Sequence, residues 1–227
     1  MPSKAAHRRL RIYGHRGDRR RALENTLESF SIALGDGADG IETDVRRLAD
    51  GTLVLFHDDE IGGTPVELFT FAELSVAWPG AVKLESLREL HGHGELILEV
   101  KRRGYARELV DAVSDLDRVV IASFDHRLVA ELAALREEFS ASFELGVTIA
   151  GNMVGGARYT RDLGARWLFP AHTFVELRAR QRVRRSRVEG GPLDPELGAV
   201  VGVLPELGLP RRHHRRAGRC GGVAGDG

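Results

Sequence analysis

The stretch from Leu10 to Asp58 decides the fold of this chain of 227 residues. Apolar β-forming residues in its first, third and fourth segments predict strands, and helical spacing in its second segment predicts a helix. Each predicted strand runs into ionisable residues, a placement that core packing alone does not explain. The four segments read LRIYGHRG (10–17), ENTLESFSIAL (24–34), GADGIETDV (37–45) and GTLVLFHDD (51–59).

Acidic residues alternate with apolar ones along the second of these strands. Strand side chains point to opposite faces in turn, so Glu42 and Asp44 share one face while their neighbours share the other. Two carboxylates side by side repel, and burying them without a partner is costly. A cation bound between them is the simplest remedy.

The composition indicates one large domain or two small ones with balanced charge. Lys plus Arg and Asp plus Glu both number 33, which argues against a general binder of nucleic acids or membrane surfaces. Cys220 is the only cysteine, so no disulfide can form within the chain. No window approaches the roughly 18 apolar residues of a transmembrane helix, and the first residues lack the apolar run of a secretory signal. We expect a cytoplasmic protein whose oligomeric state the sequence leaves open.

Beyond Asp58 the chain alternates between helical and strand patterns. Segment 60–83 has Gly62-Gly63 and two prolines around a short helical piece at 71–77, and we interpret it as a loop excursion over one end of the domain. Further strands are predicted at 95–101, 118–123, 143–149 and 166–169. Helices are predicted at 84–90, 106–113, 128–139 and 153–162, after a first helix that Thr26 caps.

This alternation predicts an α/β fold made of parallel strand–helix units. Six units in about 170 residues suit a TIM (β/α)8 barrel with two units still to come. A doubly wound open sheet is the competing architecture, but no glycine-rich phosphate loop follows the first strand. Barrel enzymes place their catalytic residues at the carboxyl ends of strands. The residues that fall there are His15, Arg16, Glu42, Asp44 and Glu99.

The predicted strand at 95–101 repeats the acidic pattern of the earlier strand. Glu99 and Lys101 share one of its faces, with apolar residues on the other. Carboxylates from two strands can therefore converge at one point in a barrel mouth. Ligation by oxygen alone suits Mg²⁺ or Ca²⁺ rather than zinc.

Basic residues at the same strand ends suit an anion. Arg16 and Lys101 would hold it, and the planar fork of arginine matches a phosphate. His15 and His57 are then the natural proton carriers, one as a base and one as an acid. Their spacing does not say which is which.

Each of these residues also has a structural explanation when it is taken alone. Arg16 could pair with Asp44, Lys101 could be a solvated strand end, and a single histidine or glutamate is more often hydrogen-bonded than catalytic. Turn and capping roles explain Asp58 and Glu24 equally well. The shared position of seven ionisable groups at strand ends favours a common site over seven separate explanations.

Five short motifs follow one another in this part of the chain. They are His15-Arg16-Gly17, Glu24-Asn25-Thr26, GADGIETDV (37–45), Leu55-Phe56-His57-Asp58 and Leu98-Glu99-Val100-Lys101. In order and spacing they resemble the glycerophosphodiester phosphodiesterases, from about Leu10 to Pro170. The resemblance implies a (β/α)8 barrel enzyme of lipid and glycerol metabolism. Such an enzyme uses a metal to hydrolyse a glycerophosphodiester to glycerol 3-phosphate and an alcohol.

The resemblance also implies roles for particular residues. By position, the metal ligands are Glu42, Asp44 and Glu99, and the acid–base pair is His15 and His57. The resemblance likewise implies that Arg16 and Lys101 contact the phosphate. Segment 60–83 takes the place of the family's inserted segment, in a short version.

Two other functions stay open. A phospholipase D-like activity on lysophospholipids or sphingomyelin uses the same barrel, and Phe69, Phe71 and Trp78 could supply an apolar rim for lipid. A non-catalytic remnant is the alternative from a different class, because the C-terminal part of the chain departs from the family pattern.

That C-terminal part, 176–227, holds eleven arginines and no lysine, and we expect a disordered basic tail after a barrel domain at 1–175. The family has instead a strand with Trp-Thr-x-Asn and a last strand that ends in Ile-Thr-Asp. GC-rich codons for 193–197, read one base later, give Trp-Thr-Leu-Asn, and the same offset at 211–217 gives Ala-Val-Ile-Thr-Asp-Glu. We hypothesise that a frameshift replaced strands seven and eight, which would open the barrel and weaken activity. A shifted frame without both motifs, or with a stop between them, would refute this.

Overall fold

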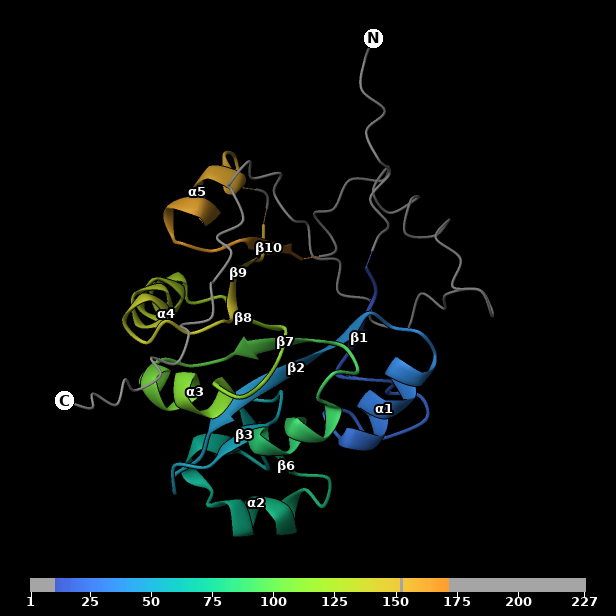
Figure 1. Ribbon diagram of the computed structural model, residues 1–227. Coiled ribbons are helices and arrows are strands. Elements are labelled where there is room, and N and C mark those ends of the chain that lie inside the picture. The colour runs from blue at the N-terminus through green and yellow to red at the C-terminus, as the bar shows by residue number, and fades with distance from the viewer. Residues whose placement is uncertain (1–10, 152, 172–227) are drawn as a thin grey trace, which may run out of the picture.

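Six parallel strands form the centre of the part of the chain that the structure describes. The computed structural model describes residues 11–151 and 153–171, and Figure 1 shows how they are arranged. Neighbouring strands pair in chain order, each with the next, which is the pattern of successive strand–helix units. The strands are β1 (Tyr13–His15), β2 (Gly40–Arg47), β7 (Glu95–Val100), β8 (Val119–Ser123), β9 (Glu144–Ile149) and β10 (Trp167–Pro170).

Helices connect these strands and cover one face of the sheet. Apolar side chains of α1, α3, α4 and η2 share one buried cluster with outward strand residues such as Ile41, Leu98 and Ile121. A doubly wound sheet carries helices on both faces, so this one-sided cover favours the predicted barrel architecture. The helices are α1 (Leu27–Gly35), the 3-10 helix η2 (Leu84–Leu90), α3 (Ala106–Val113), α4 (His126–Glu138) and α5 (Gly156–Asp162).

The opposite face of the sheet carries a smaller apolar cluster. Tyr13 of β1 packs there with Ile97 and Trp167, although β1 and β10 lie at opposite ends of the parallel set. The Arg11 guanidinium lies 5.8 Å from the centre of the Trp167 ring. The sheet therefore curls toward a barrel. The predicted seventh and eighth strands and the predicted tail fall outside the described residues.

β2 continues past its pairing with β1 into an antiparallel extension of the same sheet. It pairs antiparallel with β3 (Leu53–Leu55) across the predicted turn, and β6 (Val82–Lys83) pairs with β3. Between β3 and β6 the chain is more regular than the predicted loop excursion. It forms β4 (Glu60–Ile61), β5 (Thr64–Pro65), the 3-10 helix η1 (Val66–Leu68) and α2 (Phe71–Ala77).

This segment has an apolar core of its own, which explains why it is ordered. Val66 and Leu74 are fully buried there against Leu48, Val54 and Phe56. Most of its elements are two or three residues long, too short for hydrophobic periodicity to reveal them. Only α2 was long enough to be predicted.

Some predicted element bounds were wrong. The first strand was expected to start its apolar run at Leu10 but spans Tyr13–His15, because Tyr13 is the residue that aligns with Gly40 of β2. Segment 84–90 does form a helix with its predicted bounds, and this helix is of the 3-10 type. Thr26 does cap α1, with the side chain of Ser29 completing a capping box. Among the described residues, no helix has the length and apolar character needed to span a bilayer.

Candidate active site

The predicted site residues come together at the carboxyl ends of β1, β2 and β7. His15 aligns with Glu42 across β1 and β2, and Asp44 aligns with Glu99 across β2 and β7. They share strand parity with Tyr13 and Ile97 of the inner cluster. These side chains therefore point to the inner face of the sheet, at the carboxyl ends of its strands.

Glu42 is the least satisfied acid of the site. It is buried, and its Oε2 lies 3.7 Å from His15 Nε2 with no hydrogen-bond partner among the described residues. Burial, together with the nearby charges of Asp44 and Glu99, raises the pKa of Glu42 well above its usual value. Burial, with Arg16 next in effect, lowers the pKa of His15 to about 4. The Glu42 carboxyl group thus lacks a positively charged partner, because the neighbouring imidazole of His15 is neutral.

Asp44 is surrounded by donors instead. Its Oδ2 accepts a hydrogen bond from Asn25 Nδ2 at 3.1 Å and lies 3.3 Å from Arg16 Nε. Its Oδ1 lies 2.7 Å from Lys101 Nζ. Burial alone would raise the pKa of Asp44, but the positive charges and hydrogen bonds outweigh it, with Lys101 foremost, so the pKa is lowered. Asp44 is therefore ionised and paired.

Lys101 joins the two strands of the acidic cluster. Its ammonium contacts the Glu99 carboxylate as well as Asp44. Burial lowers the pKa of a lysine, but these two acids more than offset it and the pKa of Lys101 is raised. Lys101 thus balances the negative charges of Asp44 and Glu99.

The acids are of the chemical type that binds a divalent metal, although their side chains do not surround a common point. Within the described residues, no three His, Cys, Asp or Glu side chains are close enough together to hold a metal ion. The ammonium of Lys101 lies between Asp44 and Glu99. However, the donors are all carboxylate oxygens, which hard dications prefer, and the buried Glu42 oxygen lacks a partner. The residues present therefore suit Mg²⁺ or Ca²⁺.

Asn25 belongs to this site, although no site role was predicted for it. It is buried and has a φ of 55°, a left-handed conformation that Asn tolerates better than most residues. Its amide nitrogen donates to Asp44, and its Oδ1 accepts from Thr43 Oγ1 at 2.8 Å. The motif Glu24-Asn25-Thr26 thus orients one acid of the site in addition to starting α1.

His57 reaches the site from the end of β3. It is partly exposed, and its Nδ1 lies 2.7 Å from Asp58 Oδ1. Arg16 Nη1 donates to Glu24 at 3.1 Å, so both acids that the sequence left open contact a predicted site residue. A small cleft lies over this group. Its lining residues are Glu24, Asn25, Phe56, His57, Asp58 and Trp78.

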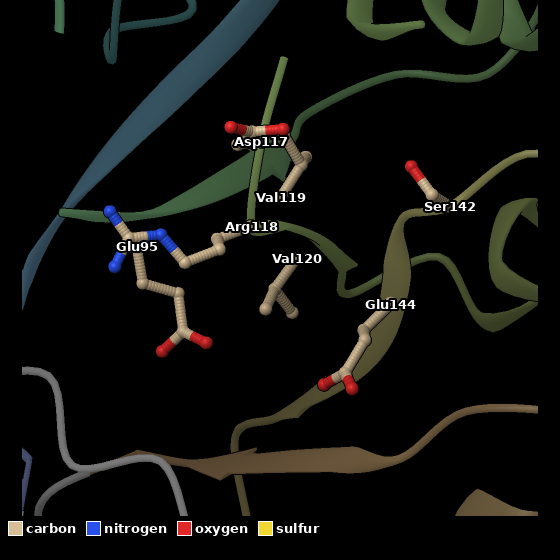
Figure 2. Close-up of a pocket in the computed structure, with 7 residues that line it drawn as sticks. All are labelled: Glu95, Asp117, Arg118, Val119, Val120, Ser142 and Glu144. Carbon is tan, nitrogen blue, oxygen red and sulfur yellow. The ribbon is translucent and has the colours of Figure 1, made fainter. Parts of the chain in front are cut away.

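A second cavity lies at the opposite, amino ends of the strands. It has a volume of about 360 Å³, and in Figure 2 the side chains of Glu95, Val120 and Glu144 project to the same side. Glu95 accepts from Arg11 and Tyr13, and Glu144 accepts from Arg166 and Trp167. Its acids are thus already paired, which separates this cavity from the candidate site.

Comparisons with known proteins agree with this arrangement. Residues 15–96 match the model of the glycerophosphoryl diester phosphodiesterase family. A glycerophosphodiester phosphodiesterase of Caldanaerobacter subterraneus subsp. tengcongensis is 30% identical over 141 residues, which are 51% of this chain and 58% of that protein. The crystal structure of a glycerophosphodiester phosphodiesterase from Thermotoga maritima matches with a TM-score of 0.64 and 27% identity, over 85% of this chain and 90% of that one.

A more distant structure shares the fold. An Oleispira antarctica phosphodiesterase in complex with sn-glycerol-3-phosphate matches with a TM-score of 0.61 and 22% identity, over 76% of this chain and 79% of that one.

The curled parallel sheet, with acids and imidazoles at the carboxyl ends of its strands, has the arrangement of a TIM-barrel fold. In sequence and fold the chain is similar to glycerophosphodiester phosphodiesterases. The match to the family model begins at His15 and ends before Glu99 and Lys101. The chain spans less than two thirds of the length of the curated Caldanaerobacter relative.

Proposed function

We propose that this protein hydrolyses glycerophosphodiesters to glycerol 3-phosphate and an alcohol, with a divalent cation bound by Glu42, Asp44 and Glu99. The observation that carries the proposal is the buried Glu42 carboxylate, which faces His15 and has an oxygen without a partner among the described residues. An acid buried in this way calls for a cation. The similarity to glycerophosphodiester phosphodiesterases supports the same reaction.

The cation is Mg²⁺ or Ca²⁺, because the donor set consists of carboxylates alone. Bound there, it would neutralise the negative charge that builds on the phosphate oxygens during hydrolysis. Arg16 and Lys101 border the same acids at 3.3 and 2.7 Å from Asp44 and would contact the phosphate. A lysine held by two acids can change partners when an anion arrives.

His15 and His57 carry the proton transfers. One imidazole removes a proton from the nucleophile, a water molecule or a neighbouring glycerol hydroxyl, whose oxygen then bonds to phosphorus. The bond between phosphorus and the leaving oxygen breaks, and the other imidazole gives that oxygen a proton. If the glycerol hydroxyl attacks, water opens the resulting cyclic phosphate by the same two transfers. The net reaction adds one water to the diester.

The aromatic residues considered for a lipid-facing rim are tied in part to the protein. Phe69 and Phe71 are partly buried against the apolar core of segment 60–83, while Leu68 and Val76 of this segment are exposed. Trp78 contacts Phe56 edge to face, with ring centres 5.7 Å apart, and lines the cleft beside His57. The cleft itself is lined by acids as well as aromatic rings.

The test is hydrolysis of glycerophosphocholine by the full chain, followed by ³¹P NMR. The protein is used in excess over the substrate so that slow turnover is still visible. We expect the resonance of glycerol 3-phosphate to grow with Mg²⁺ or Ca²⁺ and to stay absent with EDTA.

Two variants of matched chemistry complete this test. Glu42→Gln should abolish product formation, because it removes the charge that faces His15. Glu95→Gln should retain it, because Glu95 lies at the amino end of β7. Hydrolysis that persists in EDTA or in Glu42→Gln would contradict the proposal. A wild type that shows no turnover with Mg²⁺ and none with Ca²⁺ would also contradict it.

A further inference from the structure

Arg46 is a buried arginine on the strand that carries the site acids. It follows Asp44 on the same face of β2, and only 2% of its side chain is exposed. A buried guanidinium needs strong partners, because removing its charge from water costs free energy. Its partners therefore show what the arginine does.

All three partners of Arg46 lie in the chain that follows β3. Its Nη2 donates to the backbone carbonyl of His57 and to Asp59 Oδ1, both at 2.7 Å, and its Nη1 donates to Glu67 Oε1 at 2.7 Å. The planar guanidinium fixes the directions of these bonds relative to one another. One side chain of β2 thus ties the proposed catalytic histidine to the barrel strand.

The other anchors of this chain segment lie on either side of His57. The Phe56 backbone N–H donates to the Asp44 carbonyl at 3.0 Å, and Val66 N–H donates to the Asp59 carbonyl at 3.0 Å. The imidazole of His57 contacts the exposed Asp58. Between these anchors, Arg46 is the side chain that holds the His57 backbone.

The two acids do not depend on Arg46 alone. Arg102, an exposed residue at the end of β7, lies 3.8 Å from Asp59 and 3.6 Å from Glu67. Asp59 is itself 76% exposed, so its ion pairs are weak. The bond from Arg46 to the His57 carbonyl has no such substitute among the described residues.

We infer that Arg46 is a positioning residue that fixes His57 against the carboxyl end of β2 through the His57 carbonyl. The inference rests on the proposed function of His57 in proton transfer. A displacement of about 1 Å in a catalytic group can cost on the order of 10²-fold in rate. Arg46 would thus act on the rate of the reaction without touching the substrate.

The first test compares Arg46→Met with Arg47→Met in the full chain. Arg47 is the next residue of β2 and pairs with Glu108 on α3, away from His57. With glycerophosphocholine and Mg²⁺, Arg46→Met should lower kcat by about 10²-fold and change KM by less than about threefold. Arg47→Met should leave both within about twofold. Equal kcat values for the two variants would overturn the inference.

A second variant separates positioning from general stability. Arg46→Met leaves Asp59 and Glu67 without their buried cation, so the triple variant Arg46→Met/Asp59→Asn/Glu67→Gln removes those charges as well. It should recover the melting temperature of the wild type but keep the low kcat, because the His57 carbonyl still lacks its donor. Recovery of kcat together with the melting temperature would reduce Arg46 to a structural role and overturn the inference.

Hydrogen exchange gives a readout that does not need activity. Amides of residues 57–67 should exchange on the order of tenfold faster in Arg46→Met than in the wild type or Arg47→Met. Unchanged exchange would overturn the inference. If the wild type exchanges as expected but shows no turnover, the proposed function fails while the tie between Arg46 and this segment stands.

Discussion

The two ends of β7 carry glutamates with opposite environments. Glu95, at the amino end, accepts hydrogen bonds from Arg11 and Tyr13 beside a cavity whose acids are all paired. At the carboxyl end, Glu99 lies with Glu42 and Asp44, three acids that share chiefly Lys101 and Arg16. The acids at the amino end are therefore expected to stabilise the fold, while we propose that those at the carboxyl end bind a cation.

Histidines at the two ends give the largest expected difference. His15→Asn should lower kcat by about 10²–10⁴-fold, because the site would lose one of its two proton carriers. His91→Asn is the matched control, since His91 lies before β7 and pairs with Asp117 at 3.0 Å. Steady-state hydrolysis of glycerophosphocholine measures both variants. Equal loss of kcat in the two would show that the carboxyl end is not the catalytic end.

Replacing the paired glutamate should destabilise the fold. Glu95→Gln replaces a carboxylate that accepts from Arg11 at 2.8 and 3.0 Å, with Tyr13 as a further donor. We expect the free energy of unfolding to fall by about 1 kcal/mol, a modest value because Arg11 is half exposed. Urea denaturation measures this, and kcat should be unchanged. Higher stability in this variant would contradict the stabilising role of Glu95.

Replacing Glu42 should have the opposite effect on the stability of the protein. Because the pKa of Glu42 is raised in the folded protein, the unfolded chain releases this proton first as pH rises, and stability is lost above about pH 4.5. In EDTA, Glu42→Gln should therefore be more stable than the wild type at pH 8. The gain should vanish near pH 4. Thermal melts across this pH range measure it, and a loss of stability at pH 8 would contradict the assignment.

The sequence predicted the parallel strands and the site acids because both follow from a period of two. Alternation along β2 and β7 gave the shared face of Glu42, Asp44 and Glu99, and the register of the strands placed them side by side. Helices α2 and α3 have their predicted bounds. These features depend on residues that are close in sequence, so the pattern within a single strand or helix is enough to predict them.

Contacts between distant residues could not be predicted in this way. Arg46 has the same parity as Asp44, but its partners lie 11 to 21 residues further along the chain, and one of them, Glu67, is in the segment predicted to be a loop. Asn25 reaches Asp44 only because its backbone is left-handed. The ion pairs of Lys101 with Asp44 and Glu99 were not predicted, since a sequence pattern does not show which counter-charge lies nearest.

Calorimetric titration of the full chain with Mg²⁺ and Ca²⁺ tests the central claim most directly, because it reports the cation without turnover. The wild type and Glu95→Gln should bind one cation per chain, and Glu42→Gln should show no saturable heat. Binding of the same strength in Glu42→Gln, or no binding in the wild type, would contradict a cation site at the carboxyl ends of β2 and β7.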